Sequence, residues 1–307
     1  MSSRYAVVDM GSNSIRLVIF EVEGRDPHSA KIVYNKKSMA GLAGYIEDGV
    51  LTSEGIEKAC TVLQKHLASA EGLGVAASDV NVFATAVLRN IDNSDSACQA
   101  VSDATGMRID LLTGDDEARL GFVGCSSSIE GDKGIVIDIG GGSTEITTWN
   151  TPEGGKPLSE SMPFGSLYLF LHYVSDIMPT RGEMFKIAEF TREHLESSRV
   201  FPQTPYLEAV GIGGSARSSI KLVRALVNPD VTDTVHVGDL QALLELPCKH
   251  YQKTLHTILR ICPDRVHTIL PGTAVLLQIM EHAGAQTLKI SKSGLREGYL
   301  IERILGR

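Results

Sequence analysis

Residues 134–148, reading GIVIDIGGGSTEITT, combine two acids with three consecutive glycines, a pattern that can hold a phosphate group. Asp138 ends a β-branched run, and Glu145 stands directly before a second one. Glycine accepts positive φ angles and lets main-chain N–H groups approach an anion closely. Two carboxylates beside such a turn suit a hard cation that bridges to phosphate oxygens. Because β-branched runs on both sides are typical of paired strands, an ordinary hairpin with surface acids is the alternative interpretation.

The same order of residue types occurs near the start of the chain. A strand-like run ends at Asp9, a small-residue turn with Ser12 and Asn13 follows, and a second strand-like run begins. A third glycine turn occupies residues 211–217. Two distant copies of one pattern indicate two related lobes rather than a short solenoid repeat. We therefore expect two α/β lobes around an interlobe phosphate-binding cleft.

The spacing of apolar residues predicts the elements that position these turns. Residues 80–84 and 107–112 are expected to be strands, residues 94–105 a helix, and residue 114 the start of another helix. This succession is typical of a mixed α/β lobe. Because residues 126–132 are small and polar, we place the boundary there, with domains at 1–126 and 127–294.

Composition restricts the class of protein. The chain has 307 residues, 43% of them hydrophobic and 21% charged, as in a globular enzyme with two cores. No apolar run approaches the roughly 18 residues of a membrane span, and no targeting segment is recognised, so we expect a cytoplasmic protein. Five scattered cysteines without a CxxC pattern favour free thiols. A net charge of −8 argues against nucleic-acid binding, and a polyanionic substrate would require locally concentrated cations.

Seven segments resemble the exopolyphosphatase and guanosine pentaphosphate phosphohydrolase family, within the actin-like and sugar-kinase ATPase superfamily. In order they are DMGSNSIRL (9–17), ATAVLRN (84–90), GDDEARLGF (114–122), DIGGGSTE (138–145), GIGGSARS (211–218), LPGTAVLLQIM (270–280) and GLREGYL (294–300). The resemblance implies two ribonuclease H-like lobes of the actin-like ATPase fold, in the family's short two-domain form. It also implies that a C-terminal helix, residues 295–307, completes the first lobe.

The resemblance assigns chemical roles to the acids. Glu117, in the first turn of its helix, matches the family's proposed general base, where the helix N-terminus favours an ionised carboxylate. Simple helix capping by the acids at 115–117 is the alternative. Asp138 and Glu145 match the family's Mg²⁺ site. Asp9 would hold a metal-bound water or accept hydrogen bonds from turn amides.

A further set of residues is expected to bind phosphate oxygens. Its members lie in the glycine turns or carry a cation near them: Ser12, Asn13, Arg16, Arg89, Gly141, Gly142, Ser143, Thr144, Gly213, Gly214 and Ser215. Arg89 is expected at a strand end, where it pairs with phosphate or is solvated. Arg16, on the strand face opposite Ile15 and Leu17, reaches phosphate or forms a surface ion pair.

Two other features concern the substrate. Lys289, Lys292 and Arg296 lie close in sequence and form either a track for a polyanion or a solvated surface. Where relatives often have arginine, this chain has Gly41, and Lys36 or Lys37 is expected to compensate. The histidines show no metal-ligand spacing, and no P-loop or GxSxG motif is present.

The expected function is Mg²⁺-dependent hydrolysis of the terminal phosphate of inorganic polyphosphate, releasing orthophosphate. A guanosine pentaphosphate 5′-phosphohydrolase uses the same chemistry and is the first alternative. Kinase or ATPase activity, and a non-catalytic polyphosphate or nucleotide sensor, are the others. Chain-length preference, dependence on monovalent ions and oligomeric state, including a homodimer, are left open.

Overall fold

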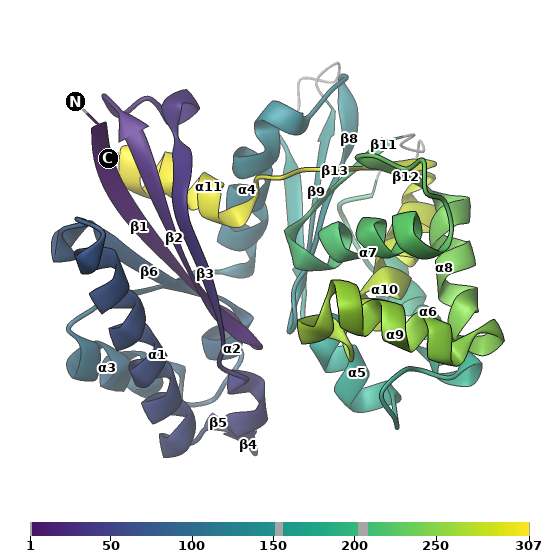
Figure 1. Cartoon of the computed structure of the whole chain (residues 1–307), viewed down its shortest axis with the longest axis horizontal. Coiled ribbons are helices and arrows are strands. Elements are labelled where there is room, and N and C mark those ends of the chain that lie inside the picture. Colours follow the sequence, from purple (N-terminus) through teal and green to yellow (C-terminus); the bar gives the residue numbers. More distant parts are fainter. Residues whose placement is uncertain (1, 151–155, 202–207, 307) are drawn as a thin grey trace. The chain divides into compact units, whose positions relative to one another are not determined.

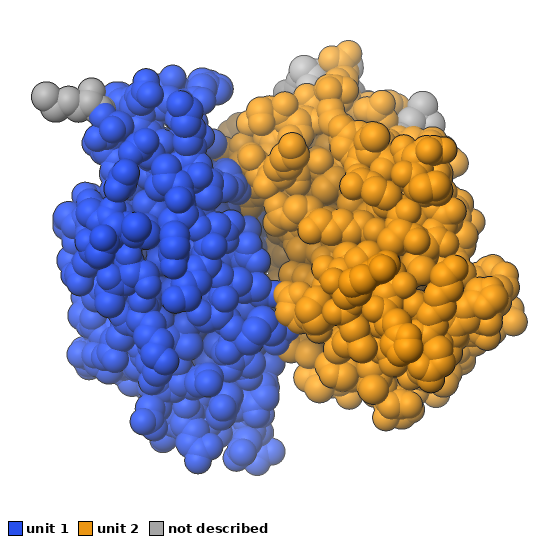
Figure 2. Space-filling model, in the orientation of Figure 1, with its two compact units in different colours: residues 1–120, 296–307 blue, residues 121–295 orange. Residues whose placement is uncertain are grey.

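The computed structural model describes residues 2–150, 156–201 and 208–306. The chain forms two compact units (Figure 2). Unit 1 contains Met1–Leu120 and Arg296–Arg307, and unit 2 contains Gly121–Leu295. The two divisions fall inside helices, α4 (Gly114–Cys125) and α11 (Leu295–Tyr299).

Unit 1 is built on a five-stranded sheet with the order β3-β2-β1-β6-β7 (Figure 1). The strands are β1 (Ser2–Met10), β2 (Ser14–Glu23), β3 (Lys31–Met39), β6 (Val80–Ala84) and β7 (Ile109–Leu111). The first three pair antiparallel, while β6 and β7 extend the sheet in parallel from β1. A small hairpin, β4 (Ile46–Glu47) with β5 (Val50–Leu51), lies outside this sheet.

Successive side chains of a strand point to opposite faces of the sheet, and both faces of this sheet are buried. One face contributes Leu17 and Ile19 to a core shared with Ala59 and Leu63 of α1 (Ser53–Gly72). Thr52 caps α1 by accepting a hydrogen bond from the N–H of Gly55, as expected for an N-cap threonine. On this side unit 1 also contains α2 (Ala86–Arg89) and α3 (Ser94–Thr105).

The C-terminal segment belongs to unit 1 although it is distant in sequence. It comprises α11 (Leu295–Tyr299) and a π-helical turn, Leu300–Leu305. The ring of Tyr299 lies 4.8 Å from that of Phe83, and its hydroxyl donates to Asp110. Arg303 pairs with Asp116 of α4 at 2.7 Å. The chain end is thus held to β6, β7 and α4 by ring packing and by polar contacts.

Unit 2 repeats the arrangement with one more strand, in the order β10-β9-β8-β11-β13-β12. The strands are β8 (Lys133–Ile139), β9 (Thr144–Asn150), β10 (Leu158–Met162), β11 (Glu208–Ile212), β12 (Thr234–His236) and β13 (Thr287–Ile290). As in unit 1, an antiparallel three-stranded meander is extended by parallel strands, here β11 and β13. The prediction of two mixed α/β lobes is confirmed.

The main core of unit 2 lies between one face of its sheet and a helical layer. Ile135, Ile137 and Ile146 face this core, which Val275 and Leu276 of the apolar helix α10 also enter. The helices are α5 (Ser166–Tyr173), α6 (Arg181–Glu196), α7 (Gly213–Leu226), α8 (Val237–Lys249), α9 (Tyr251–Ile261) and α10 (Ile269–Ala283). The opposite sheet face packs Val136 and Val210 against Phe122 and Cys125 of α4.

Three local predictions need correction. Arg89 ends the short helix α2 rather than a strand, because the chain turns directly after β6 at Thr85. Gly213 and Gly214, expected within a glycine turn over residues 211–217, already belong to the first turn of α7. In place of the single helix expected over residues 295–307, the described residues form α11 followed by the π-helical turn. Within the described residues, no helix is long and apolar enough to span a membrane.

Candidate functional site

In each unit the candidate residues gather at the carboxyl ends of the parallel strands. In unit 1 the turn after Asp9 follows β1, Arg89 lies in the helix after β6, and Glu117 lies in the helix after β7. In unit 2 the triple-glycine turn follows β8, and Gly213 follows β11. Ligands of open α/β sheets bind beyond these strand ends. The topology of each unit therefore places its candidates where the fold class binds ligands.

The triple-glycine turn of unit 2 is fixed by the first residues of α5. The carbonyl of Gly140 accepts hydrogen bonds from the N–H and the hydroxyl of Ser166, both at 2.9 Å. The carbonyl of Gly141 accepts from the N–H groups of Leu167 and Tyr168. A Cβ at position 165 would approach this turn within 2.7 Å, so Gly165 permits the close contact.

This anchoring decides where the turn amides point. A trans peptide group directs its N–H opposite to its C=O, and the described chain contains no cis peptide bond. Because the carbonyls of Gly140 and Gly141 face α5, the N–H groups of Gly141 and Gly142 point away from it. Neither N–H has an acceptor among the described residues. Two adjacent amides with one direction form an anion-binding concavity.

Asp138 and Glu145 face each other across the β8–β9 hairpin. They are direct partners in its antiparallel register, so their side chains lie on the same sheet face. Glu145 is only 3% exposed and accepts a hydrogen bond from the hydroxyl of Ser161 at 2.8 Å. Asp138 is half-buried. The hairpin thus holds two carboxylates side by side just before the triple-glycine turn.

The first residues of α7 lie against Asp138 on one side and against Arg265 on the other. A Cβ at position 213 would overlap Oδ1 of Asp138, and Gly213 has a φ of +74°, so both space and backbone require glycine there. A Cβ at position 214 would overlap the guanidinium of Arg265, which ends a short 3₁₀ turn, Pro263–Arg265. The N-terminus of α7 therefore lies between an acid and an arginine. Arg265 has no motif around it, and sequence reasoning missed it.

Two hydroxyl groups near the triple-glycine turn donate hydrogen bonds within unit 2. Thr144 is fully buried and donates to the carbonyl of Phe164 at 2.8 Å. Ser215 is 1% exposed and donates to the carbonyl of Ile139 at 2.8 Å, which ties α7 to the end of β8. Ser143 is also buried. The polar groups of the turn that remain open to a ligand are therefore main-chain amides.

The charge of Asp138 also acts on a neighbouring thiol. The pKa of Cys125 is raised to about 12, chiefly by burial and then by the negative charge of Asp138. Cys125 belongs to α4 and packs on the same sheet face as Val136. It is thus a buried, protonated thiol with no role as a nucleophile.

The β1–β2 turn of unit 1 repeats the design of the triple-glycine turn. The carbonyl of Asn13 accepts from the N–H groups of Ala40 and Gly41, and the carbonyl of Ser12 accepts from that of Ala43. By the same peptide geometry, the N–H of Asn13 points away from this anchoring segment. Among the described residues it has no acceptor. Unit 1 therefore also presents a main-chain donor beside an acid.

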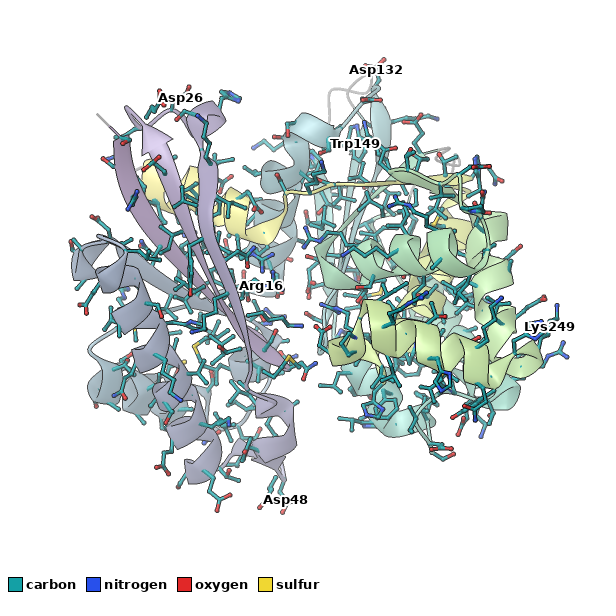
Figure 3. All side chains as sticks on the ribbon, in the orientation of Figure 1. Arg16, Asp26, Asp48, Asp132, Trp149 and Lys249 are labelled. Carbon is teal, nitrogen blue, oxygen red and sulfur yellow. The ribbon has the colours of Figure 1, made fainter. Side chains whose placement is uncertain are left out.

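Two arginines, Arg296 and Arg16, lie near Asp9. Arg296 donates to its Oδ2 at 3.1 Å, and both side chains are largely buried, at 22% and 16% exposed. Arg16 stands opposite Asp9 in the β1–β2 register and donates to Oδ1 of Asn35 at 3.2 Å; its side chain extends from β2 in Figure 3. Burial raises the pKa of Asp9, and the two arginines oppose that shift. Asp9 is therefore an ion-pair partner of Arg296 in unit 1, a contact that was not predicted from the sequence.

Glu117 is paired with Arg89. Nη1 of Arg89 donates to Oε2 of Glu117 at 2.9 Å and to the carbonyl of Leu112 at 3.1 Å. Glu117 is 8% exposed, in the first turn of α4. The arginine and the helix N-terminus both favour the carboxylate form of Glu117. Arg89 thus holds the candidate base through an ion pair.

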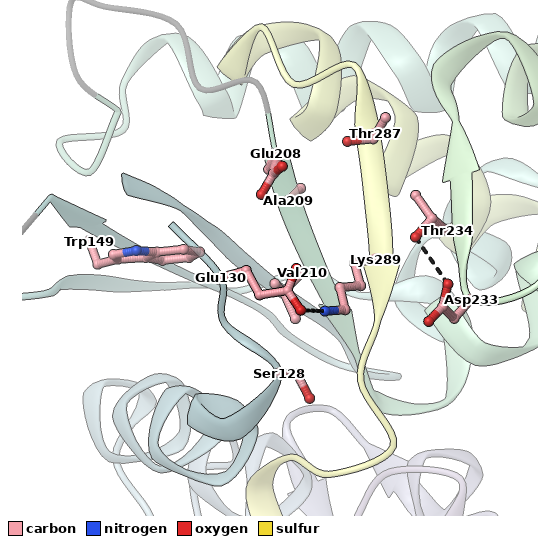
Figure 4. A pocket seen from close by; sticks show the side chains of 10 residues that line it. All are labelled: Ser128, Glu130, Trp149, Glu208, Ala209, Val210, Asp233, Thr234, Thr287 and Lys289. Atoms are coloured by element: carbon pink, nitrogen blue, oxygen red, sulfur yellow. Dashed lines mark hydrogen bonds and ion pairs between the residues drawn. The ribbon is translucent and has the colours of Figure 1, made fainter. Parts of the chain in front are cut away.

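Unit 2 also contains a separate pocket of about 350 Å³ (Figure 4). It lies at the amino-terminal ends of β11 and β13, away from the glycine turns, and Trp149 forms one wall. Three carboxylates, those of Glu130, Glu208 and Asp233, accompany the single cation Lys289, which pairs with Glu130 at 2.5 Å. This charge balance is unfavourable for a polyanion.

The basic cluster expected late in the chain is divided between different partners. Lys289 belongs to unit 2 and pairs with Glu130. Arg296 belongs to unit 1 and pairs with Asp9. The carbonyl of Lys292 accepts a hydrogen bond from Arg217.

The donor set of unit 2 fits Mg²⁺. In the described part of the chain no group of three or more His, Cys, Asp or Glu side chains could enclose a metal. Mg²⁺ does not require such a cage, because it is usually held by one or two carboxylates, waters and substrate phosphates. Asp138 is half-buried and precedes the turn that carries the open amides, so it matches the role of such a carboxylate. Glu145 lies opposite Asp138 in the hairpin.

Comparison with known proteins places the chain in a family. The bifunctional 3-dehydroquinate synthase/phosphatase of Fusobacterium nucleatum is 26% identical over 313 residues, which cover 97% of this chain and 46% of that protein. The chain thus spans about half the length of this relative. Exopolyphosphatase 1 of Mycobacterium tuberculosis is 24% identical over 312 residues, covering 98% of this chain and 88% of that protein.

A solved structure shows the same fold. The crystal structure of the Aquifex aeolicus member of the Ppx/GppA family superposes with a TM-score of 0.79 at 24% identity, covering 100% of this chain and 99% of that one. A family model described as the Ppx/GppA phosphatase family matches residues 18–306. Since that match extends over most of the sequence, the chain belongs to the Ppx/GppA phosphatase family.

Proposed function

We propose that this chain is an exopolyphosphatase that hydrolyses the terminal phosphoanhydride bond of inorganic polyphosphate and releases orthophosphate. The observation that carries the proposal is the pair of open amides at Gly141 and Gly142 beside the facing acids Asp138 and Glu145. An anion-binding turn next to carboxylates that suit Mg²⁺ is what phosphoryl transfer requires. Membership of the phosphatase family and the similarity to Exopolyphosphatase 1 support the same chemistry.

The proposed reaction needs three contributions from the protein. The amides of Gly141, Gly142 and Asn13 would bind non-bridging oxygens of the terminal phosphate. Glu117, paired with Arg89, would orient a water molecule and accept its proton during attack on phosphorus. Mg²⁺ held by Asp138 would neutralise the charge on the phosphate oxygens. That residues of both units serve one reaction is part of the proposal.

The role of Arg89 differs from the one expected from the sequence. Because its Nη1 is shared between Glu117 and the Leu112 carbonyl, Arg89 is proposed as a positioning residue for the base. A guanidinium has five N–H donors, so contact with a phosphate oxygen remains compatible with that role.

The test is orthophosphate release in the presence of Mg²⁺ from long-chain polyphosphate and from guanosine pentaphosphate, with wild type and Glu117→Gln. We expect wild type to turn over polyphosphate and Glu117→Gln to lose activity by about 10²- to 10⁴-fold, the usual contribution of a general base. Preference for the nucleotide would instead favour the guanosine pentaphosphate phosphohydrolase. Binding without release from either substrate would favour a non-catalytic sensor.

A further inference from the structure

The pocket of unit 2 lies on the sheet face that carries Trp149. Glu208 and Val210 are two positions apart on β11, so their side chains point to the same face, on which Val210 packs in one cluster with Trp149. In the β11–β13 register Thr287 stands opposite Glu208, and Lys289 stands opposite Val210. All five residues line the pocket. Its floor is therefore one face of β11 and β13.

Trp149 forms a packed aromatic wall of this pocket. It stands opposite Gly134 in the β8–β9 register, and a Cβ at position 134 would overlap its indole ring. The missing side chain of Gly134 therefore leaves room for the ring to lie across β8. Trp149 is only 6% exposed, and its ring centroid lies 6.0 Å from that of Phe122 of α4. Since Trp149 is the single tryptophan of the sequence, its fluorescence reports on this pocket.

Two carboxylates of the pocket lack a positively charged partner. The ammonium group of Lys289 pairs with Glu130 at 2.5 Å. Among the described residues no cation pairs with Glu208 or Asp233, and Oδ1 of Asp233 accepts a hydrogen bond from the hydroxyl of Thr234 at 3.2 Å. Both acids are exposed, so a ligand can reach them. The charge that the pocket offers to a ligand is therefore negative, at two separate positions.

The two carboxylates come from strands that are not neighbours. Glu208 begins β11, whereas Asp233 directly precedes β12, and β13 passes between them (Figure 4). Neighbouring strands are about 4.8 Å apart, so β11 and β12 are separated by about 10 Å. In the described part of the chain, no group of three or more His, Cys, Asp or Glu side chains could hold a metal ion. This arrangement suits a linear ligand with a cation at each end better than a single metal ion.

We propose that this pocket binds a linear aliphatic diamine, with one ammonium group at Glu208 and the other at Asp233. The first ammonium group also lies on the side of the pocket that Trp149 forms, and the ring of a tryptophan attracts organic cations. The methylene groups of the ligand pass over the sheet face between the two acids. A volume of about 350 Å³ is at the small end of ligand-binding sites and suits a short diamine. The site lies at the opposite strand ends from the glycine turns and does not depend on the proposed function.

The experiment is equilibrium dialysis of the whole chain against radiolabelled putrescine. We expect one saturable site in wild type, and a dissociation constant that rises roughly two- to fivefold in Glu208→Gln and in Asp233→Asn, as for the loss of one exposed ion pair. The two effects should multiply in the double variant, because the sites are well separated. Glu189→Gln is the matched control, since Glu189 is an exposed acid of α6 that does not line the pocket. Thermal unfolding checks that each variant is folded.

Ligand analogues and fluorescence give two further readouts. Butylamine carries one ammonium group and should bind more weakly than putrescine, while butanediol carries none and should not compete with putrescine. The emission of Trp149 should change during the putrescine titration, with the same half-saturation as the dialysis. Glu208→Gln should move both half-saturation points together.

Four outcomes would overturn the diamine site. They are no saturable binding of putrescine to wild type, equal effects of Glu208→Gln and Glu189→Gln, equal affinity for butylamine and putrescine, and saturation without a change in the emission of Trp149. The second would leave only a general attraction of cations by an acidic chain, and the last would place the ligand outside this pocket. None of these measurements uses orthophosphate release, so failure of the diamine site and failure of the proposed function are distinguishable.

Discussion

Nη1 of Arg89 donates to Oε2 of Glu117 at 2.9 Å, joining the end of α2 to the first turn of α4. The pair is only 19% and 9% exposed at its side chains, so solvent screens it weakly. Because Arg89 also donates to the Leu112 carbonyl, the guanidinium is fixed relative to β7 and α4. The candidate base is therefore held in place before any substrate arrives.

Replacing Arg89 by methionine should lower activity through Glu117. We expect kcat on polyphosphate to fall by about tenfold or more, since hydrogen bonds to charged groups contribute about 1.5–3 kcal/mol. Arg4→Met is the matched control, because Arg4 pairs with Glu21 at an exposed site. Steady-state kinetics of both variants provide the measurement. A similar small change in kcat for both would show that the Arg89 pair has no part in the reaction.

Replacing Gly213 by alanine should damage the site through Asp138. The new Cβ would overlap Oδ1 of Asp138, and the φ of +74° is unfavourable for alanine by about 1–2 kcal/mol. We expect a lower midpoint of urea unfolding together with weaker activation by Mg²⁺. Gly182→Ala, at a helical site where a Cβ meets open space, should leave Mg²⁺ activation unchanged. Equal activation in the two variants would argue against Asp138 as a metal ligand.

Replacing Gly41 by alanine should strain the backbone and lower stability. Its φ of +62° lies in the left-handed region, while a Cβ there meets no atom within 4 Å. Gly41→Ala is therefore expected to lower the free energy of unfolding by about 1 kcal/mol. Gly44→Ala, also in open space but without a positive φ, should cost less. Urea unfolding of both variants measures the difference, and equal stabilities would contradict the conformational explanation.

His66 should make unit 1 less stable in mild acid. Burial lowers its pKa from the ordinary value of 6.5, and Nε2 lies 3.3 Å from the Ile15 carbonyl. Since the unfolded chain binds the proton more readily, this contribution is complete above about pH 6.5 and is lost as the pH falls through the folded pKa. Urea unfolding of wild type between pH 7 and 5 should therefore show a steeper loss than that of His66→Gln. Parallel curves would mean that His66 does not contribute.

The cysteines should differ in reactivity according to burial. Cys125, with its pKa raised to about 12, is expected to resist iodoacetamide at pH 8 in the folded protein, whereas exposed Cys248 should be alkylated. Mass spectrometry of digested samples identifies the modified thiols. Asp138→Asn should leave Cys125 protected, because burial is the larger cause of its high pKa. Rapid alkylation of Cys125 in wild type would contradict its buried position.

Sequence alone determined the features that depend on neighbouring residues. The helix over residues 94–105 occurs with those bounds, and Thr180 caps α6 in a capping box with Glu183. The facing of Asp138 and Glu145 follows once the glycines are interpreted as a hairpin turn. Side-chain spacing and capping act over a few positions, so a local pattern is sufficient to specify them.

Tertiary structure decided the partners of the charged residues. The ion pair of Asp9 with Arg296 joins the two ends of the chain, and Arg265 reaches Gly214 from a separate turn. The placement of Lys36 and Lys37 on opposite faces of the sheet likewise depends on the register of β3 against β2. Electrostatic and packing contacts depend on distance in space, and chain folding sets that distance independently of separation in sequence. The sequence therefore indicated the candidate acids and turns, while the fold determined which cations pair with these acids.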